Sequence, residues 1–163
     1  MTELEIIPIR SEHLPELERK INEYNKEKED SAKLAIQTHL RAARKALDNP
    51  NILFLLALEK ETGQIVGYSY AEILAKVQHK AIDHWTVNLA KKESAKRVAG
   101  IGTELFKRKI AILAERRVSE IHGKAKNAGI KLLLEKIARE IGLKAEWPEQ
   151  SDDTKFVLRV NRK

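Results

Sequence analysis

The 163-residue sequence contains no cysteine, so disulfides, thiolate nucleophiles and thiolate metal sites are excluded. It has no run of about 18 apolar residues, and we therefore expect no membrane span. Its acidic N-terminus lacks the basic and apolar regions of a signal peptide, which makes the cytoplasm the expected location. Internal repeats, low-complexity tracts and linker-like stretches are also missing, so we expect one domain over residues 1–163.

Several enzyme motifs are absent as well. The chain has neither a Gly-x-Ser-x-Gly elbow nor a Walker loop. Gly100-x-Gly102 lacks the third glycine and the following acidic residue of a dinucleotide-binding fold. No metal site is expected, because metal-ligand spacing is not found among the five histidines His13, His39, His79, His84 and His122.

What the chain does have is charge of both signs. The net charge of +7 comes from 31 basic and 24 acidic residues. Such a surplus suits nucleic acid, or a cofactor carrying several phosphates. Because most of the basic residues lie on helix faces mixed with glutamate, a solvated surface is the simpler interpretation.

Hydrophobic periodicity predicts strands alternating with helices in one α+β, mixed-sheet domain. We expect strands at residues 4–9, 52–58, 65–73, 81–89, 118–125 and 155–160. A turn containing Gly63 joins the second and third strands into an antiparallel hairpin. We expect helices near residues 11–24, at 32–47 and 101–117, and in a last segment that Gly142 stops.

The stretch between Arg97 and Thr103 follows a predicted strand and opens a predicted helix. Two glycines, Gly100 and Gly102, allow the backbone to approach a bulky ligand closely. The first amides of a helix have no partner within it and point outward at the positive end of its dipole, which makes them a site for pyrophosphate. The alternative is an ordinary strand-to-helix turn, in which glycine only permits the bend.

Taken together, these features resemble the GNAT superfamily, the Gcn5-related N-acetyltransferases. Arg97-x-x-Gly100-x-Gly102 matches the acetyl-CoA signature of that family, Gln/Arg-x-x-Gly-x-Gly/Ala, and follows a strand that ends near Val87. Asn127 opens a helix that closes at Gly142-Leu143, similar to the Asn-led helix of the family with its closing Gly-Phe. The resemblance covers nearly the whole chain and implies a largely antiparallel, twisted sheet with helices on both faces and one splayed strand pair.

The resemblance also implies a set of acetyl-CoA contacts. The pyrophosphate would lie on the amides of residues 98–103, beside Arg97, and the pantetheine arm would add to a strand edge. A backbone amide at that edge would stabilise the oxyanion of direct attack. The residues implied in cofactor binding are Val87, Asn88, Leu89, Arg97, Val98, Ala99, Gly100, Ile101, Gly102, Thr103 and Asn127.

This sequence departs from the family pattern in three places. The loop of residues 88–96 is about twice as long as in many relatives and rich in lysine. In many relatives the Asn-led helix carries a tyrosine that protonates the leaving thiolate, whereas here the comparable residues are Leu132, Leu133 and Leu134. Leu143 replaces the closing phenylalanine. No general acid can therefore be assigned.

Three side chains are candidates for the base that removes a proton from the attacking amine. Asp83 lies four residues before Val87, where some relatives carry an acidic base, and His84 is its neighbour on the opposite face of the strand. Glu72, near the end of the preceding strand, is the third. A structural or surface role is the alternative for each. Tyr68 and Tyr70 share one strand face and either line an acceptor channel or pack in the core.

The leading hypothesis is acetyl transfer from acetyl-CoA to a primary amine of a small molecule or a protein. The second is a GNAT-like module that binds acyl-CoA without turnover, as a regulator. The third is a nucleic-acid-binding domain that uses Lys91, Lys92, Lys96, Arg97, Lys107 and Arg108. A homodimer is compatible with all three, since dimers are common among the relatives.

Overall fold

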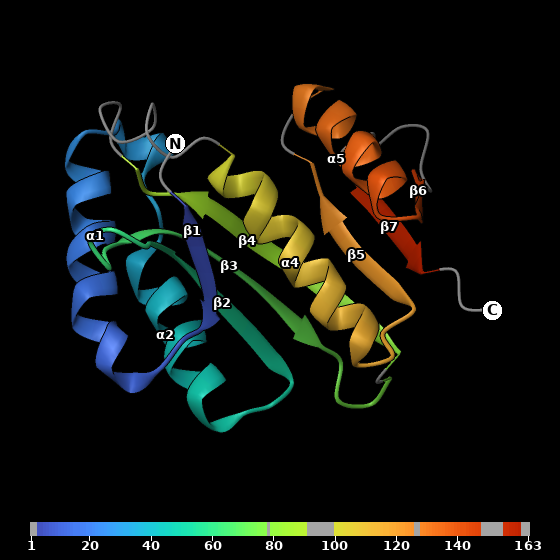
Figure 1. The fold of residues 1–163 in the computed structure, drawn as a ribbon, viewed down its shortest axis with the longest axis horizontal. Coiled ribbons are helices and arrows are strands. Elements are labelled where there is room, and N and C mark those ends of the chain that lie inside the picture. The colour runs from blue at the N-terminus through green and yellow to red at the C-terminus, as the bar shows by residue number, and fades with distance from the viewer. Residues whose placement is uncertain (1–2, 78, 91–99, 126–127, 148–154, 161–163) are drawn as a thin grey trace. The chain divides into compact units, whose positions relative to one another are not determined.

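The computed structural model describes residues 3–77, 79–90, 100–125, 128–147 and 155–160 (Figure 1). Its helices are α1 Leu14–Lys26, α2 Ile36–Asp48, α4 Ile101–Glu115 and α5 Ala128–Glu140, with short 3₁₀ turns at Ser11–His13 and Asp30–Ala32. Its strands are β1 Leu4–Pro8, β2 Ile52–Glu59, β3 Ile65–Ile73, β4 Lys80–Asn88, β5 Glu120–Lys124, β6 Leu143–Glu146 and β7 Lys155–Val160.

The strands form a mixed sheet with the order β1-β2-β3-β4-β5-β7-β6. β1 pairs antiparallel with β2, and β7 pairs antiparallel with both β5 and β6. The pairing of β4 with β5 is parallel, which interrupts an otherwise largely antiparallel arrangement. The α+β fold with a mixed sheet, predicted from periodicity, is confirmed.

The structure adds one strand to the predicted elements and ends one predicted helix earlier. The helix expected to reach Arg117 ends at Glu115, because Arg117 adopts a left-handed φ of 66° and the Val118 amide donates back to Leu113 O at 3.0 Å. This is a helix-terminating turn of the Schellman type, here without its usual glycine. Strand β6 was not predicted, since four residues are too few to show alternation.

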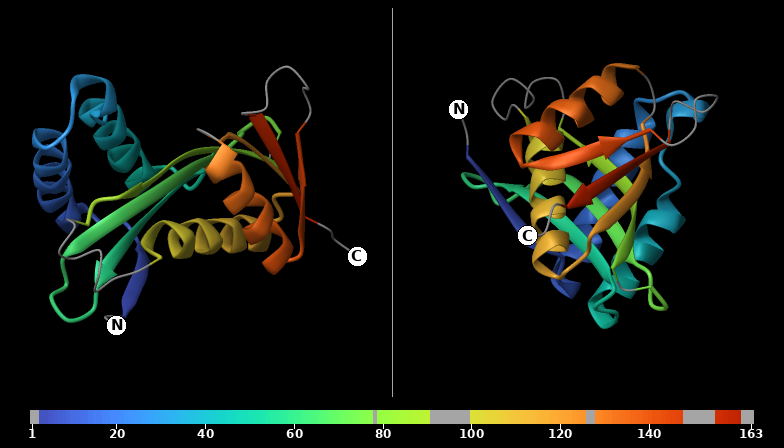
Figure 2. Two further views of the ribbon diagram at one scale, coloured as in Figure 1. Left: turned by 90° about the horizontal axis from the view of Figure 1, so that it is seen from above. Right: turned by 90° about the vertical axis from the view of Figure 1, so that its right-hand side faces the viewer.

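The chain divides into two compact units, unit 1 of residues 1–70 and 85–106 and unit 2 of residues 71–84 and 107–163. In unit 1, α1 and α2 lie side by side over one face of the strands (Figures 1 and 2). Both helices present apolar residues to that face at helical spacing. The core cluster of unit 1 includes Leu17, Ile21, Leu40, Ala43, Phe54, Leu56, Tyr68, Tyr70, Val87 and Leu89.

Helices cover both faces of β3 within unit 1. Successive residues of a strand point to opposite faces of the sheet, so Gly67 and Tyr68 face opposite ways. The Tyr68 side lies against His39 of α2, whereas Gly67 lies against Ile101 of α4. This agrees with the expectation of helices on both faces.

A buried aromatic cluster fills the space between α2 and the sheet. Tyr68 and Tyr70 both stack on Phe54, with ring centroids 5.5 and 5.1 Å away, which confirms that the two tyrosines share a face. His39 is 1% exposed, and its Nδ1 is hydrogen-bonded to the Tyr68 hydroxyl. Because Tyr68 and Tyr70 are 0% and 4% exposed, they pack in the core and do not line an open channel.

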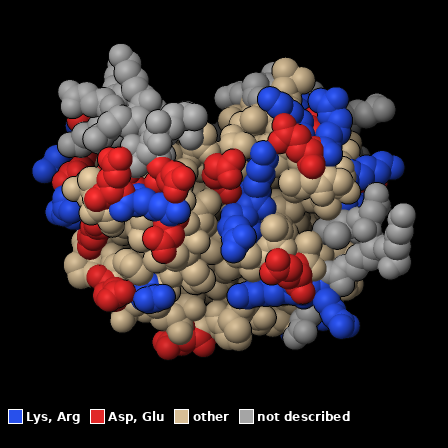
Figure 3. Space-filling model, in the orientation of Figure 1, with Lys and Arg blue, Asp and Glu red and all other residues tan. Residues whose placement is uncertain are grey.

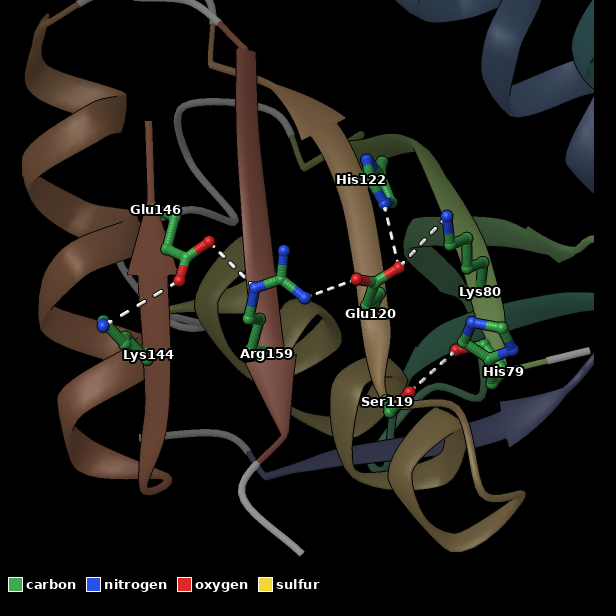
Figure 4. A network of polar contacts seen from close by, with 8 residues as sticks. All are labelled: His79, Lys80, Ser119, Glu120, His122, Lys144, Glu146 and Arg159. Atoms are coloured by element: carbon green, nitrogen blue, oxygen red, sulfur yellow. Dashed lines mark hydrogen bonds and ion pairs between the residues drawn. The ribbon is translucent and has the colours of Figure 1, made fainter. Parts of the chain in front are cut away.

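In unit 2, β5, β7 and β6 form an antiparallel sheet whose polar face carries a ladder of charges (Figure 4). The register places Lys80, Glu120, Arg159 and Lys144 side by side across four strands. Arg159 bonds Glu120, and its Nε donates to Glu146 at 2.8 Å. The hydrogen bond from Arg159, followed by the nearby charge of Lys80, holds the pKa of the Glu120 carboxyl below its usual range.

The buried tyrosines predict a loss of stability in alkali. Burial raises the pKa of Tyr70 to about 12 and that of Tyr68 further still. In the unfolded chain a tyrosine has a pKa of about 10, so the folded state holds these protons more tightly and its stability falls as pH rises above about 10.

We expect the Tyr70→Phe variant to lose less unfolding free energy than wild type between pH 9 and 12, measured by urea titration. Tyr24→Phe is the matched control. Equal losses in wild type and Tyr70→Phe would contradict this explanation.

Candidate functional site

The start of α4 carries the predicted anion-binding turn. Gly100 adopts a φ of +77°, a conformation that side chains rarely allow. Its carbonyl accepts the Glu104 amide at 2.9 Å, which is the first hydrogen bond of the helix in the described chain. The amides of Ile101, Gly102 and Thr103 therefore precede the hydrogen bonding of the helix and are the donors that a helix start offers to an anion.

The space around this turn is open to a ligand. Among described atoms, none lies within 4 Å of where a Cβ on Gly100 would be. A Cβ on Gly102 would have Thr86 Cγ2, 3.9 Å away, as its nearest neighbour. Backbone amides with this clearance fit the oxygens of a phosphate, and the helix dipole favours a negative charge there. The described part of this turn therefore has room for an anion such as a phosphate.

Gly67 of β3 sets the position of α4. A Cβ at Gly67 would lie 2.7 Å from Ile101 Cγ2, 2.8 Å from Val87 O and 3.0 Å from Leu105 Cδ1. No side chain fits there, so only glycine allows the first turns of α4 to rest on the strand. The sequence indicated Gly67 as part of the hairpin, but the contact with α4 becomes visible only in the fold.

The end of β4 lies beside this turn in unit 1. Val87 and Leu89 are 5% and 8% exposed and pack in the core, so their side chains are turned away from any ligand at this strand. The Leu89 amide donates to Val66 O of β3 at 2.9 Å, and exposed Asn88 accepts the Ala90 amide. Seven of the predicted cofactor residues are thereby placed, whereas Arg97, Val98, Ala99 and Asn127 lie outside the described residues.

Two contacts join β4 to α4, one within each unit. In unit 2, Asp83 forms an ion pair with Lys109. In unit 1, Thr86 Cγ2 lies 3.9 Å from where a Cβ on Gly102 would be.

β4 and β5 separate at Asp83 within unit 2. Their pairing runs from Lys80↔Glu120 to Ile82↔His122, and the next opposed residues, Asp83 and Gly123, are not paired with each other. A Cβ on Gly123 would lie 2.5 Å from Phe156 Cζ and 3.1 Å from Asp83 Cβ. The side chains of Phe156 and Asp83 therefore occupy the space that a side chain at position 123 would need, next to the point where the β4–β5 pairing ends. This is the strand separation that the family resemblance implies.

The three predicted acid–base residues lie on two faces of the sheet. Asp83 faces α4 and forms an ion pair with Lys109, whose side chain is 0% exposed. His84 points the other way, and its Nε2 lies 3.5 Å from Glu72 Oε2. The structure therefore brings His84 and Glu72 together and separates them from Asp83.

Sequence analysis missed Lys109. The signal was a lysine in the middle of an apolar stripe, since Leu105, Lys109 and Leu113 follow one another at four-residue spacing and are all 0% exposed. Burial lowers the pKa of the Lys109 ammonium, and the nearby Asp83 carboxylate opposes that shift.

The positions comparable to the family's tyrosine are apolar and largely exposed. Leu132 and Leu133 of α5 are 67% and 39% exposed, while Leu134 is buried. None of the three side chains can donate a proton.

Among the described residues, no group of three or more His, Asp or Glu side chains is arranged to bind a metal. None of the described helices combines the length and apolarity of a membrane span.

No family model and no curated protein matches the sequence. Solved structures do match. The PaiA N-acetyltransferase from Thermoplasma acidophilum in complex with coenzyme A is 18% identical, with a TM-score of 0.65 over 97% of this chain and 99% of that one. A GNAT family acetyltransferase from Brucella melitensis in complex with acetyl-CoA is also 18% identical, with a TM-score of 0.63 over 99% and 91% of the two chains.

The ribosomal-protein-S18-alanine N-acetyltransferase from Escherichia coli is 12% identical, with a TM-score of 0.61 over 96% of this chain and 92% of that chain. At such identities the likeness establishes the fold. The matches cover nearly the full length of both chains. The chain has the fold of the GNAT acetyltransferases.

Proposed function

We propose that this protein is an acyltransferase that moves the acetyl group of acetyl-CoA to a primary amine. The observation that carries the proposal is the start of α4, where the amides of residues 101–103 precede the first described hydrogen bond of the helix and the described atoms leave room for a Cβ at both Gly100 and Gly102. The turn belongs to a chain with the GNAT fold. Two solved structures with this fold contain a bound cofactor, coenzyme A in one and acetyl-CoA in the other.

The binding roles follow from the backbone of unit 1. The amides of residues 101–103 receive the pyrophosphate, and the backbone of Val87, Asn88 and Leu89 receives the pantetheine arm as an added strand. Neither role needs a particular side chain, which is consistent with the buried side chains of Val87 and Leu89. Acetyl-CoA enters as a substrate and supplies the thioester.

The reaction transfers one acetyl group and one proton. The amine nitrogen bonds to the thioester carbon, the carbon–sulfur bond breaks, and the amine proton leaves for a base while the thiolate takes up a proton. A backbone amide of β4 stabilises the oxyanion that forms on the carbonyl. We assign the base to Asp83, which the Lys109 ion pair favours in its ionised form, with His84 and its neighbour Glu72 as the alternative.

A second candidate is a module that binds acyl-CoA without turnover. The observation in its favour is the row of leucines at 132–134, because none of these three side chains can donate a proton to the leaving thiolate. Acetyl consumption separates the two candidates, because only the enzyme releases free coenzyme A.

A nucleic-acid-binding role receives less support. On the face shown in Figure 3, Lys and Arg are interspersed with Asp and Glu, so positive charge does not gather into one patch there. Lys107, one of the six basic residues considered, is paired with Glu140 at 2.8 Å, and Lys91, Lys92, Lys96 and Arg97 lie outside the described residues.

The glycine turn gives a direct test of coenzyme A binding. We expect Gly102→Glu to weaken coenzyme A binding at least about a hundredfold in calorimetric titration, because a carboxylate beside the phosphates adds bulk and repulsion. Gly102→Ala is the matched control and should bind as wild type does, since its Cβ has room. Unchanged affinity for coenzyme A in a folded Gly102→Glu variant would contradict the placement of the pyrophosphate at this turn.

The assignment of the base is tested by turnover. With a panel of primary amines and release of the coenzyme A thiol as the readout, we expect Asp83→Asn to lower kcat by about a hundredfold or more without changing affinity for coenzyme A. His84→Gln and Glu72→Gln should retain most of the activity. The opposite result, full turnover in Asp83→Asn and loss in His84→Gln, would assign the base to His84.

A further inference from the structure

We propose that Lys109 is a positioning residue for Asp83, holding that carboxylate ionised and fixed at the point where β4 and β5 separate. The proposal deepens the proposed function, because it explains how a base can remain charged in a nearly buried place. It rests on the geometry of unit 2 and on no property of a bound ligand.

The first observation is the cost of burying Lys109. Its side chain is 0% exposed, and it lies between Leu105 and Leu113 on the buried stripe of α4. An apolar residue would satisfy packing there, whereas an ammonium away from water is unfavourable unless it is paired. The lysine therefore needs a compensating partner.

The second observation is the place of that partner. Asp83 pairs with Lys109 through Oδ1, its side chain is 11% exposed, and it is the first residue of β4 beyond the pairing with β5. Phe156 and the backbone of Gly123 border it on the β5 side. The ion pair consequently fixes the carboxylate within unit 2, at the residue where the pairing of β4 with β5 ends.

The third observation is the contrast with the other ion pairs of unit 2. Glu120, Arg159 and Glu146 form a ladder on the polar face, with side chains 16%, 45% and 34% exposed (Figure 4). Lys107, two residues before Lys109, pairs with Glu140 at 31% and 42% exposure. Water screens such surface pairs, whereas the Lys109–Asp83 pair is shielded from water and each charge depends on the other.

Loss of the ammonium changes the protonation of Asp83. A carboxylate that is shielded from water and has no counter-ion takes up a proton more readily than one beside a cation. Lys109 from α4, Gly123 from β5 and Phe156 from β7 lie against Asp83, and Lys109 is the charged group among these three. Replacing Lys109 by a neutral residue should therefore favour the protonated form of Asp83.

The experiment is a ¹³C NMR titration of side-chain carboxyl groups from pH 5 to 8, with the Asp83 signal identified by its loss in Asp83→Asn. We expect Asp83 to stay ionised throughout in wild type and in Lys109→Arg, and to titrate within this range in Lys109→Met. Lys107→Met, which breaks a surface pair on the same helix, should match wild type. Superimposable Asp83 curves in wild type and Lys109→Met would overturn the proposal.

A measurement on the wild-type protein covers the case in which Lys109→Met does not fold. The Lys109 ¹³Cε and Asp83 ¹³Cγ signals should then move together at one alkaline midpoint, as the shared ion pair loses its proton. Midpoints that differ would equally overturn the proposal. Wild type is titrated with coenzyme A in parallel. Failure to bind coenzyme A would contradict the proposed function, whereas the NMR titration tests the positioning role of Lys109.

Discussion

The first turn of α4 rests on the backbone of β3 at Gly67, and this contact determines what the start of the helix can do. With Ile101, Val87 O and Leu105 all within 3.0 Å of the missing Cβ, the helix cannot move closer, and a side chain would push it away. The amides ahead of Glu104 are thereby held beside the end of β4. Anion binding at this turn is thus a consequence of a close contact between a strand and a helix.

The sequence predicted the parts of this arrangement that are local. Gly100 and Gly102 at a helix start, the largely apolar β2 and the alternating β7 each carry their signal within a few residues. The four residues of β6 were too few to show a period. The role of the lysine inside the apolar stripe of α4 could not be inferred, because its partner is distant in the sequence. The ion pair joins residues 26 positions apart (83 and 109), which periodicity does not connect.

The candidate acid–base residues show the same limit. Alternation placed Asp83 and His84 on opposite faces, and in unit 2 Asp83 pairs with Lys109 whereas His84 lies beside Glu72. The partner of Asp83 on α4 and the end of the β4–β5 pairing at Ile82 have no signal in a regular alternating pattern. The missing tyrosine, by contrast, could be recognised from residues 132–134 alone.

The central claim is that the backbone at the start of α4 binds the phosphates of coenzyme A. The most direct measurement is a ¹H–¹⁵N correlation spectrum of the labelled protein titrated with coenzyme A. The account predicts that the largest shifts fall on the amides of Gly100, Ile101, Gly102 and Thr103, with a second group at Val87, Asn88 and Leu89. Saturable shifts located elsewhere, with these amides unchanged, would contradict it.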